Sequence, residues 1–240
     1  MKTFALVIFF TGFYRIANAQ TYAVINDKDG FVNIRKDKSA RSALVGKIHD
    51  DDIFLCGDED DNDKSDWIKI YRQDFDRNGI DGFIHKSRIF PLSKFKSIKN
   101  VKSYKDSCVA VNDSLTIIVK SRLFNPKIHK LSYSKPGQNG NGQKELMKID
   151  GNHIWGTDGD LPHTKISSVK ILKKGISIII PKESFDDLYE PSFRTLHVYF
   201  GKNDTIYIEM DNGDGAGAYS IFWIIKNGQY SKRYIDNSNV

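Results

Sequence analysis

The sequence predicts an all-β protein: a small barrel, then a second antiparallel β domain that forms a sandwich or an open barrel. Short runs of alternating apolar and polar residues recur along the chain, rich in β-branched and aromatic side chains. Turn-forming Asp, Asn and Gly separate these runs, and only residues 182–188 have a pattern compatible with a short helix. The 3 Trp, 11 Tyr and 15 Phe residues can supply a buried core, which argues against disorder.

The first nineteen residues have the pattern of a signal peptide. Lys2 supplies a positive charge, residues 4–13 form an apolar stretch, and Ala17-Asn18-Ala19 offers small residues for cleavage before Gln20. This stretch is too short to span a bilayer, and nowhere in the chain do about 18 apolar residues follow one another. We therefore expect an exported protein, periplasmic or secreted, with no transmembrane segment after cleavage. A buried N-terminal strand is the alternative.

Residues 20–92 are expected to form the first domain. Five or six short strands in about 70 residues are typical of a small barrel, because closing the sheet leaves few exposed edges. The candidate strands are residues 23–26, 31–35, 44–48, 53–56, 67–71 and 82–85.

Within this domain the order of several short motifs resembles a known family. The motifs are Asp29–Arg35 (DGFVNIR), Val45-Gly46, Trp67–Ile70 (WIKI) and Asp81–His85 (DGFIH). Together they resemble the bacterial SH3-like (SH3b) domain over residues 22–92. The resemblance implies an exported binding module of the cell envelope, and it does not imply catalysis. Lys36-Asp37-Lys38 replaces the family's usual Gly-Pro, and Phe83 replaces its closing Trp.

Residues 109–240 are expected to form the second domain. A strand is expected at 114–119, and three pairs of strands flank short turns, which indicates consecutive hairpins in an antiparallel meander. The pairs are 168–172 with 175–180, 196–200 with 205–210, and 219–225 with 229–235. Two glycine-rich segments, 155–162 and 211–219, resemble segments of uncharacterised exported bacterial proteins, and that resemblance carries no activity.

Two groups of residues are candidates for ligand binding. Trp67, Tyr71 and Phe83 could form an aromatic groove for a peptide, although alternating aromatic residues could equally fill the barrel interior. In the second domain, the candidates are Asp211, Asp214 and Tyr219, because glycines around them allow close backbone approach and the carboxylates could meet a cation or a sugar hydroxyl. Tight hairpin connections are the alternative explanation.

A metal site is suggested at Asp74, Asp76 and Asn78. With Gly79 they reproduce the D-x-[DN]-x-[DN]-G opening of a calcium loop. The pattern then fails, because His85 stands where a bidentate Glu belongs, and the segment lies between strands. A solvated hairpin turn explains the same residues. No cofactor is otherwise expected.

Charge is distributed unevenly, and the net charge of +6 averages two opposite regions. Residues 50–66 are acidic, whereas residues 82–135 are strongly basic. Residues 93–108 contain five lysines and are expected to be a basic linker or an extended edge. Export argues against a nucleic-acid partner, so the basic region predicts an anionic envelope polymer, or complements the acidic region within the molecule.

Two cysteines, Cys56 and Cys108, allow one disulfide in an oxidising compartment. It would close a loop of about fifty residues and join the two domains. Burial of Cys56 as a small apolar residue is the alternative.

Catalytic motifs are missing from the sequence. There is no zinc-binding H-E-x-x-H and no G-x-S-x-G elbow, and the carboxylates at 183–190 are better explained as a solvated face. The sequence therefore predicts a non-catalytic binding protein of the bacterial envelope that recognises a cell-wall peptide or polymer, or a periplasmic protein. The alternative is a peptidoglycan-type hydrolase that uses the barrel as a targeting module.

Overall fold

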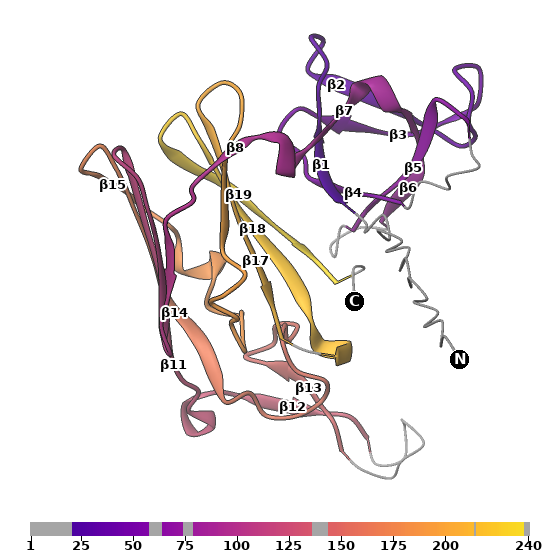
Figure 1. Cartoon of the computed structure of the whole chain (residues 1–240). Helices are drawn as coiled ribbons and strands as arrows, with labels where there is room; N and C mark the ends of the chain where they lie inside the picture. Colours follow the sequence, from indigo (N-terminus) through magenta and orange to yellow (C-terminus); the bar gives the residue numbers. More distant parts are fainter. Residues whose placement is uncertain (1–20, 58–63, 74–78, 136–143, 214, 238–240) are drawn as a thin grey trace, which may run out of the picture.

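The computed structural model describes residues 21–57, 64–73, 79–135, 144–213 and 215–237. The predicted signal peptide, residues 1–19, lies outside these ranges. The described chain is all-β, with strands in antiparallel sheets joined by turns and short 3-10 segments (Figure 1). Those segments are Lys86–Arg88, Leu92–Lys94, Pro126–Ile128, Lys182–Ser184 and Gly215–Gly217. The expected helix at 182–188 is therefore a single 3-10 turn.

The N-terminal unit is one seven-stranded sheet, in the order β3-β2-β6-β5-β4-β1-β7, that curls into a small barrel (Figure 1). Each of the six strand runs expected in residues 20–92 forms a strand, and the three-residue β7 is an addition. Successive side chains of a strand point to opposite faces of the sheet. In β2 this places Val32 and Ile34 in the barrel core, while Phe31, Asn33 and Arg35 point outward. The strands are β1 (Thr21–Ile25), β2 (Phe31–Arg35), β3 (Leu44–His49), β4 (Phe54–Cys56), β5 (Trp67–Arg72), β6 (Ile80–His85) and β7 (Ile89–Pro91).

The C-terminal unit is a sandwich of two five-stranded sheets. One sheet has the order β15-β14-β11-β10-β9 and the other β19-β18-β17-β16-β8. The strands are β8 (Lys96–Ser97), β9 (Val101–Ser103), β10 (Ser107–Val111), β11 (Leu115–Leu123), β14 (Thr164–Lys173), β15 (Ile176–Ile178), β16 (His197–Phe200), β17 (Thr205–Asn212), β18 (Tyr219–Lys226) and β19 (Gln229–Asp236). A separate two-stranded sheet contains β12 (Leu131–Tyr133) and β13 (Leu146–Ile149). All three expected hairpins are present.

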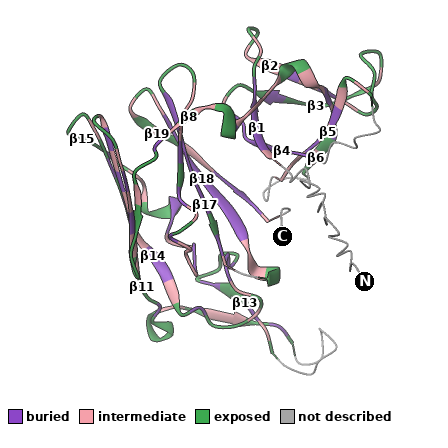
Figure 2. Ribbon diagram, viewed as in Figure 1, coloured by how far each residue is buried: buried purple, intermediate pink, exposed green. Residues whose placement is uncertain are grey.

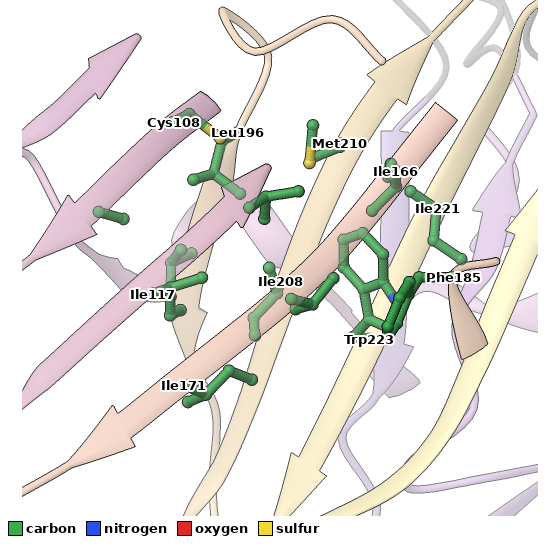
Figure 3. Packing of buried hydrophobic residues seen from close by; sticks show 14 of the residues in the cluster. Cys108, Ile117, Ile166, Ile171, Phe185, Leu196, Ile208, Met210, Ile221 and Trp223 are labelled. Atoms are coloured by element: carbon green, nitrogen blue, oxygen red, sulfur yellow. The ribbon is translucent and has the colours of Figure 1, made fainter. Parts of the chain in front are cut away.

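Apolar side chains of both sheets fill the sandwich (Figure 3). Trp223 is fully buried among residues that include Ile166, Ile208 and Ile221. Its indole Nε1 donates a 2.9 Å hydrogen bond to the Ser184 carbonyl, so the one polar atom of the ring is satisfied in the core.

The basic segment 93–108 is part of the sandwich and not a linker. It contains β8, which pairs with β16 at the edge of one sheet, and β9, which pairs with β10 at the edge of the other. The chain therefore passes from one sheet to the other within this segment. Lysines between its apolar positions suit edge strands, because charged side chains there oppose pairing with other molecules.

The barrel packs on the outer face of the β16–β19 sheet through a shared apolar cluster. Tyr22 and Val24 of β1 contact side chains that include Tyr207, Phe222 and Ile224. The rings of Tyr22 and Phe222 meet edge to face at 4.6 Å. Strand β18 is accordingly buried on both faces (Figure 2), which explains its uninterrupted apolar run.

Ion pairs surround this interface. Asp52 of the barrel lies 2.8 Å from Lys232 Nζ and 3.3 Å from Arg72 Nη2, and Asp51 lies 3.3 Å from Lys232. Although burial opposes ionisation, the bonds from Lys232 and His49 and the nearby Arg72 hold the pKa of Asp52 below its ordinary value. Lys226 of β18 lies 4.0 Å from Asp50 and 3.8 Å from Asp51. The described partners of Asp50–Asp52 are therefore Lys226, Lys232 and Arg72, and none of them belongs to the basic region 82–135.

Cys56 and Cys108 do not form the disulfide that their number allows. Neither is part of a disulfide and both are buried, Cys56 in the barrel core and Cys108 in the sandwich core. Burial raises the pKa of the Cys108 thiol to about 12. Each thiol therefore acts as a small apolar core group.

Membrane-spanning helices are not found in the described ranges: none of the helical segments there has the length and apolar composition that crossing a bilayer requires.

Candidate functional site

A groove of about 440 Å³ opens on the outer surface of the barrel. We call it the barrel groove. It combines aromatic rings, carboxylates and guanidinium groups drawn from β2, β5 and the ends of β1 and β6. Its lining residues are Asp27, Asp29, Phe31, Val32, Asn33, Arg35, Ala40, Trp67, His85, Ser87 and Arg88.

The groove follows from how β2 and β6 pair. The two strands are joined at Arg35 and Phe83 only. Continued antiparallel pairing would place Asn33 opposite His85, yet the ladder ends before that point. The outward side chains of β2 and β6 therefore flank an opening, and β5 contributes Trp67 beside His85.

Polar contacts fix the walls of the groove. The His85 Nδ1 atom accepts a hydrogen bond from the Ser87 backbone N–H at 3.3 Å, and its ring meets Trp67 edge to face at 5.6 Å. Arg88 Nη1 forms a 2.5 Å ion pair with Asp27 Oδ2. These contacts hold the aromatic and charged groups in place before any ligand arrives.

One polar atom of the groove lacks a partner. The Asn33 side-chain oxygen is buried, and no hydrogen bond reaches it from the described residues. A buried acceptor without a donor costs roughly 1–3 kcal/mol, so such atoms are rare in folded proteins. A ligand N–H group at this position would remove that cost.

The predicted aromatic groove of Trp67, Tyr71 and Phe83 does not assemble as one surface. Trp67 lines the barrel groove, whereas Tyr71 packs against the cluster between the two units. Phe83 lies under the ammonium of Lys38, 5.6 Å from its ring centre. Of the three residues, only Trp67 belongs to the site.

In the second unit, Asp211 and Tyr219 do line one cavity, of about 280 Å³, at the end of the β17–β19 sheet. We call it the sandwich cavity, and its lining residues are Ser192, Thr195, Asp211, Asn212, Gly213, Ala218, Tyr219, Ser220 and Asp236. Tyr219 is buried and its hydroxyl donates to the Tyr189 carbonyl at 3.0 Å, so the ring forms a wall. Asp214 lies outside the described residues.

The two glycine-rich segments noted in the sequence pack against each other. The Gly156 N–H donates to the Gly217 carbonyl at 3.0 Å. A Cβ atom on Gly217 would lie 2.5 Å from the carbonyl carbon of Thr157. Glycine at 217 is therefore required by close backbone approach.

Among the described residues there is neither a metal-binding cluster nor a pair of carboxylates free to act in hydrolysis. Asp74, Asp76 and Asn78 of the calcium-like motif lie outside them, and no group of three His, Cys, Asp or Glu within them could hold a metal ion. Asp187 forms a bidentate pair with Arg233, at 2.5 and 2.7 Å, and Asp186 pairs with the buried Lys165 at 2.7 Å. These two carboxylates are held in ion pairs and are not a solvated face.

Comparison with protein-family models, curated proteins and solved structures gave no match. The function has to be inferred from the two cavities themselves.

Several lining residues were missed by sequence reasoning. Phe31, Asn33 and Arg35 were noted as part of a family motif but not as ligand contacts; their outward positions along β2 are the signal that could have singled them out. Ser220 and Asp236 lie across neighbouring strands from Asp211, and only the register of β17, β18 and β19 brings them together.

Proposed function

We propose that this protein is a non-catalytic binding protein of the bacterial envelope, and that the barrel groove holds an extended peptide. The signal-peptide pattern and the resemblance of residues 22–92 to bacterial SH3-like domains support the envelope assignment. The lining of the groove supports the ligand class.

The mixed lining suits a short peptide of the cell wall or of a periplasmic protein. Phe31 and Trp67 offer aromatic surface for an apolar side chain. Asp29 and Arg35 offer opposite charges for the amino and carboxyl groups of such a peptide. Pockets that combine apolar surface with a few placed polar groups are the usual form of a ligand site.

The observation that carries the proposal is the buried, unpaired oxygen of Asn33 in the same groove as Trp67. A peptide backbone supplies N–H donors at regular intervals along an extended chain. A bound peptide can therefore satisfy Asn33 while it packs on the indole ring.

The test is co-sedimentation of the full chain with purified insoluble peptidoglycan, with Trp67→Ala and Asn33→Leu compared with the wild type. Both changes should weaken binding by at least about tenfold, because each removes a central contact of the groove. Phe83→Ala is the matched control, since it removes a partly buried ring from the same sheet outside the groove.

Binding that survives Trp67→Ala, or that Phe83→Ala abolishes equally, would contradict the proposal. Circular dichroism of each variant shows whether the fold is retained. Release of soluble fragments from the peptidoglycan by the wild type would also contradict it, because the proposal assigns no catalysis.

A further inference from the structure

The β15-β14-β11-β10-β9 sheet has an outward face that is open to solvent in the described chain. Its inward side chains fill the sandwich core, and the barrel packs on the opposite sheet. Figures 1 and 2 accordingly show β11 and β14 on the side of the sandwich away from the barrel. We call this surface the outer sheet face. Its apolar side chains are Val109, Val111, Ile118 and Leu172, and its lysines are Lys102, Lys120 and Lys170.

Strand pairing gathers the apolar side chains into one strip. Val109 of β10 pairs with Ile118 of β11, and in the neighbouring row Thr116 pairs with Val111 on one side and with Leu172 on the other. Side chains that face each other across paired strands are about 4.5–5.5 Å apart at Cβ, so the strip is continuous. None of these residues belongs to a core cluster of the described chain, and Leu172 is 39% exposed.

The same strip extends to the edge of the sheet at β15. Ile179 directly follows the last residue of β15 and is 84% exposed. Its neighbour Ile178 is buried in the sandwich core, so the two side chains point to opposite sides of the sheet. A large apolar side chain this exposed, next to an apolar strip, marks a surface for contact with another molecule.

Lysines surround the strip. Lys102 and Lys170 stand at the two ends of the row that contains Val109 and Ile118, and Lys120 lies two residues beyond Ile118 on the same face of β11. All three lysines are exposed, and none forms an ion pair with an Asp or Glu of the described chain. The outer sheet face therefore carries three positive charges that the described chain does not neutralise.

Acidic residues do not offset this charge. The five strands of the sheet contain no Asp and no Glu. In its hairpin turns, Asp106 and Asp113 are matched in number by Lys105 and Lys174. The turns thus add no net charge, and the face itself remains at +3.

The combination of charge and apolar surface selects among possible partners. A second copy of the chain, packed face to face, would bring like-charged lysines together, which opposes association. A soluble anionic polymer would pair with the lysines but leave the apolar strip exposed. The surface of an anionic bilayer satisfies both, because its phosphates attract lysines while apolar side chains enter the boundary of the headgroups and acyl chains.

We propose that the outer sheet face docks this protein peripherally on a bilayer that contains anionic phospholipid. The lysine ammonium groups meet lipid phosphates, and Leu172 and Ile179 enter the headgroup region. The inference does not depend on the barrel groove. Docking of this face leaves the barrel on the side of the sandwich away from the lipid, because the β16–β19 sheet lies between them.

The test is flotation with vesicles of phosphatidylglycerol and phosphatidylcholine in equal parts, compared with vesicles of phosphatidylcholine alone. The protein used is the chain from Gln20 onward, which contains every described residue and lacks the apolar residues 4–13, whose own insertion would mask the effect. It should float with the anionic vesicles and not with the neutral ones. Raising the salt from about 0.1 to 0.5 M should release it, because salt screens exposed charges.

Two variants separate the contributions of charge and apolar contact. Each lysine near an anionic membrane contributes a factor of about five to the partition coefficient, so changing Lys102, Lys120 and Lys170 together to Gln should weaken binding by about a hundredfold. Changing Leu172 and Ile179 together to Ser should weaken it by about fivefold or more. Circular dichroism of each variant shows whether the fold is retained.

The matched control changes Lys28, Lys36 and Lys64 together to Gln. These are exposed lysines of the barrel, away from the outer sheet face, and the change in net charge is the same. Binding to the anionic vesicles should fall by no more than about twofold. A loss equal to that of the other lysine variant would show that net charge alone drives binding, and would overturn the proposal.

Three further results would overturn it. The first is absence of flotation with the anionic vesicles. The second is unchanged vesicle binding by the folded Leu172→Ser, Ile179→Ser variant, together with equally tight wild-type binding to soluble polyphosphate, which would indicate an anionic polymer. The third is a wild-type dimer in sedimentation equilibrium that the same Ser variant makes monomeric, which would show that a second copy covers the face.

Discussion

Glu209 makes the stability of this protein depend on pH near neutrality. The residue is 8% exposed on β17, and burial with the charge of Asp211 raises its pKa from an ordinary 4.5 to about 7 in the folded chain, despite the hydrogen bond with Tyr199. Between these two pH values the folded state keeps a proton that the unfolded chain has released. The free energy of unfolding therefore falls as the pH rises from about 4.5 to about 7.

The change Glu209→Gln removes this dependence, because glutamine imitates the protonated acid and cannot ionise. At about 1.4 kcal/mol for each pKa unit, a rise from 4.5 to about 7 amounts to roughly 3 kcal/mol. The variant should be more stable than the wild type by up to that amount above pH 7. Below about pH 4.5 the two proteins should be equally stable.

The assay is urea denaturation of both proteins at several pH values between 4 and 8.5, with the difference in free energy of unfolding plotted against pH. All other titrating groups are common to the two proteins and cancel in this difference. A difference that is constant with pH, or one that favours the wild type at pH 8, would refute the reasoning.

Three other predictions concern packing and charge. Asp52→Asn leaves Lys232 without its closest carboxylate at the interface of the two units, so urea denaturation at pH 7 should show a free energy of unfolding lower by about 1–3 kcal/mol. This difference should vanish as the pH falls through the lowered pKa of Asp52. Gly217→Ala forces a Cβ atom against the backbone of the facing loop, and its melting temperature should fall by an amount equivalent to about 1–3 kcal/mol; an unchanged value would contradict the close approach. Without reductant, a thiol reagent should count two thiols per unfolded chain, Cys56 and Cys108; fewer would indicate a bridge.

The hairpins could be predicted from the sequence because their signals are local. Asn227 and Gly228 both adopt positive φ in the turn between β18 and β19, as a two-residue hairpin turn requires. The short strands β7, β8 and β12 carry too few residues for an alternating pattern to appear. Their positions depend on partners elsewhere in the chain.

The two sites were harder to predict, since each combines residues that are distant in sequence. The sequence singled out Trp67 and Asp211, but Asn33 becomes significant only where β2 and β6 part. Ser220 and Asp236 join Asp211 only through the register of β17, β18 and β19. Neither meeting leaves a local signal in composition or spacing, so sequence reasoning found single members of each site and not the set.

The β16–β19 sheet is covered on one face by the sandwich core and on the other by the barrel, so cutting the chain between the two units would expose apolar surface. A cut near residue 94 would expose Tyr207, Phe222 and Ile224 on one fragment and Tyr22 on the other. Contiguous apolar surface of this kind promotes aggregation. We therefore expect the barrel and the sandwich to unfold in a single cooperative transition, and an excised barrel to be insoluble unless its contact face is redesigned.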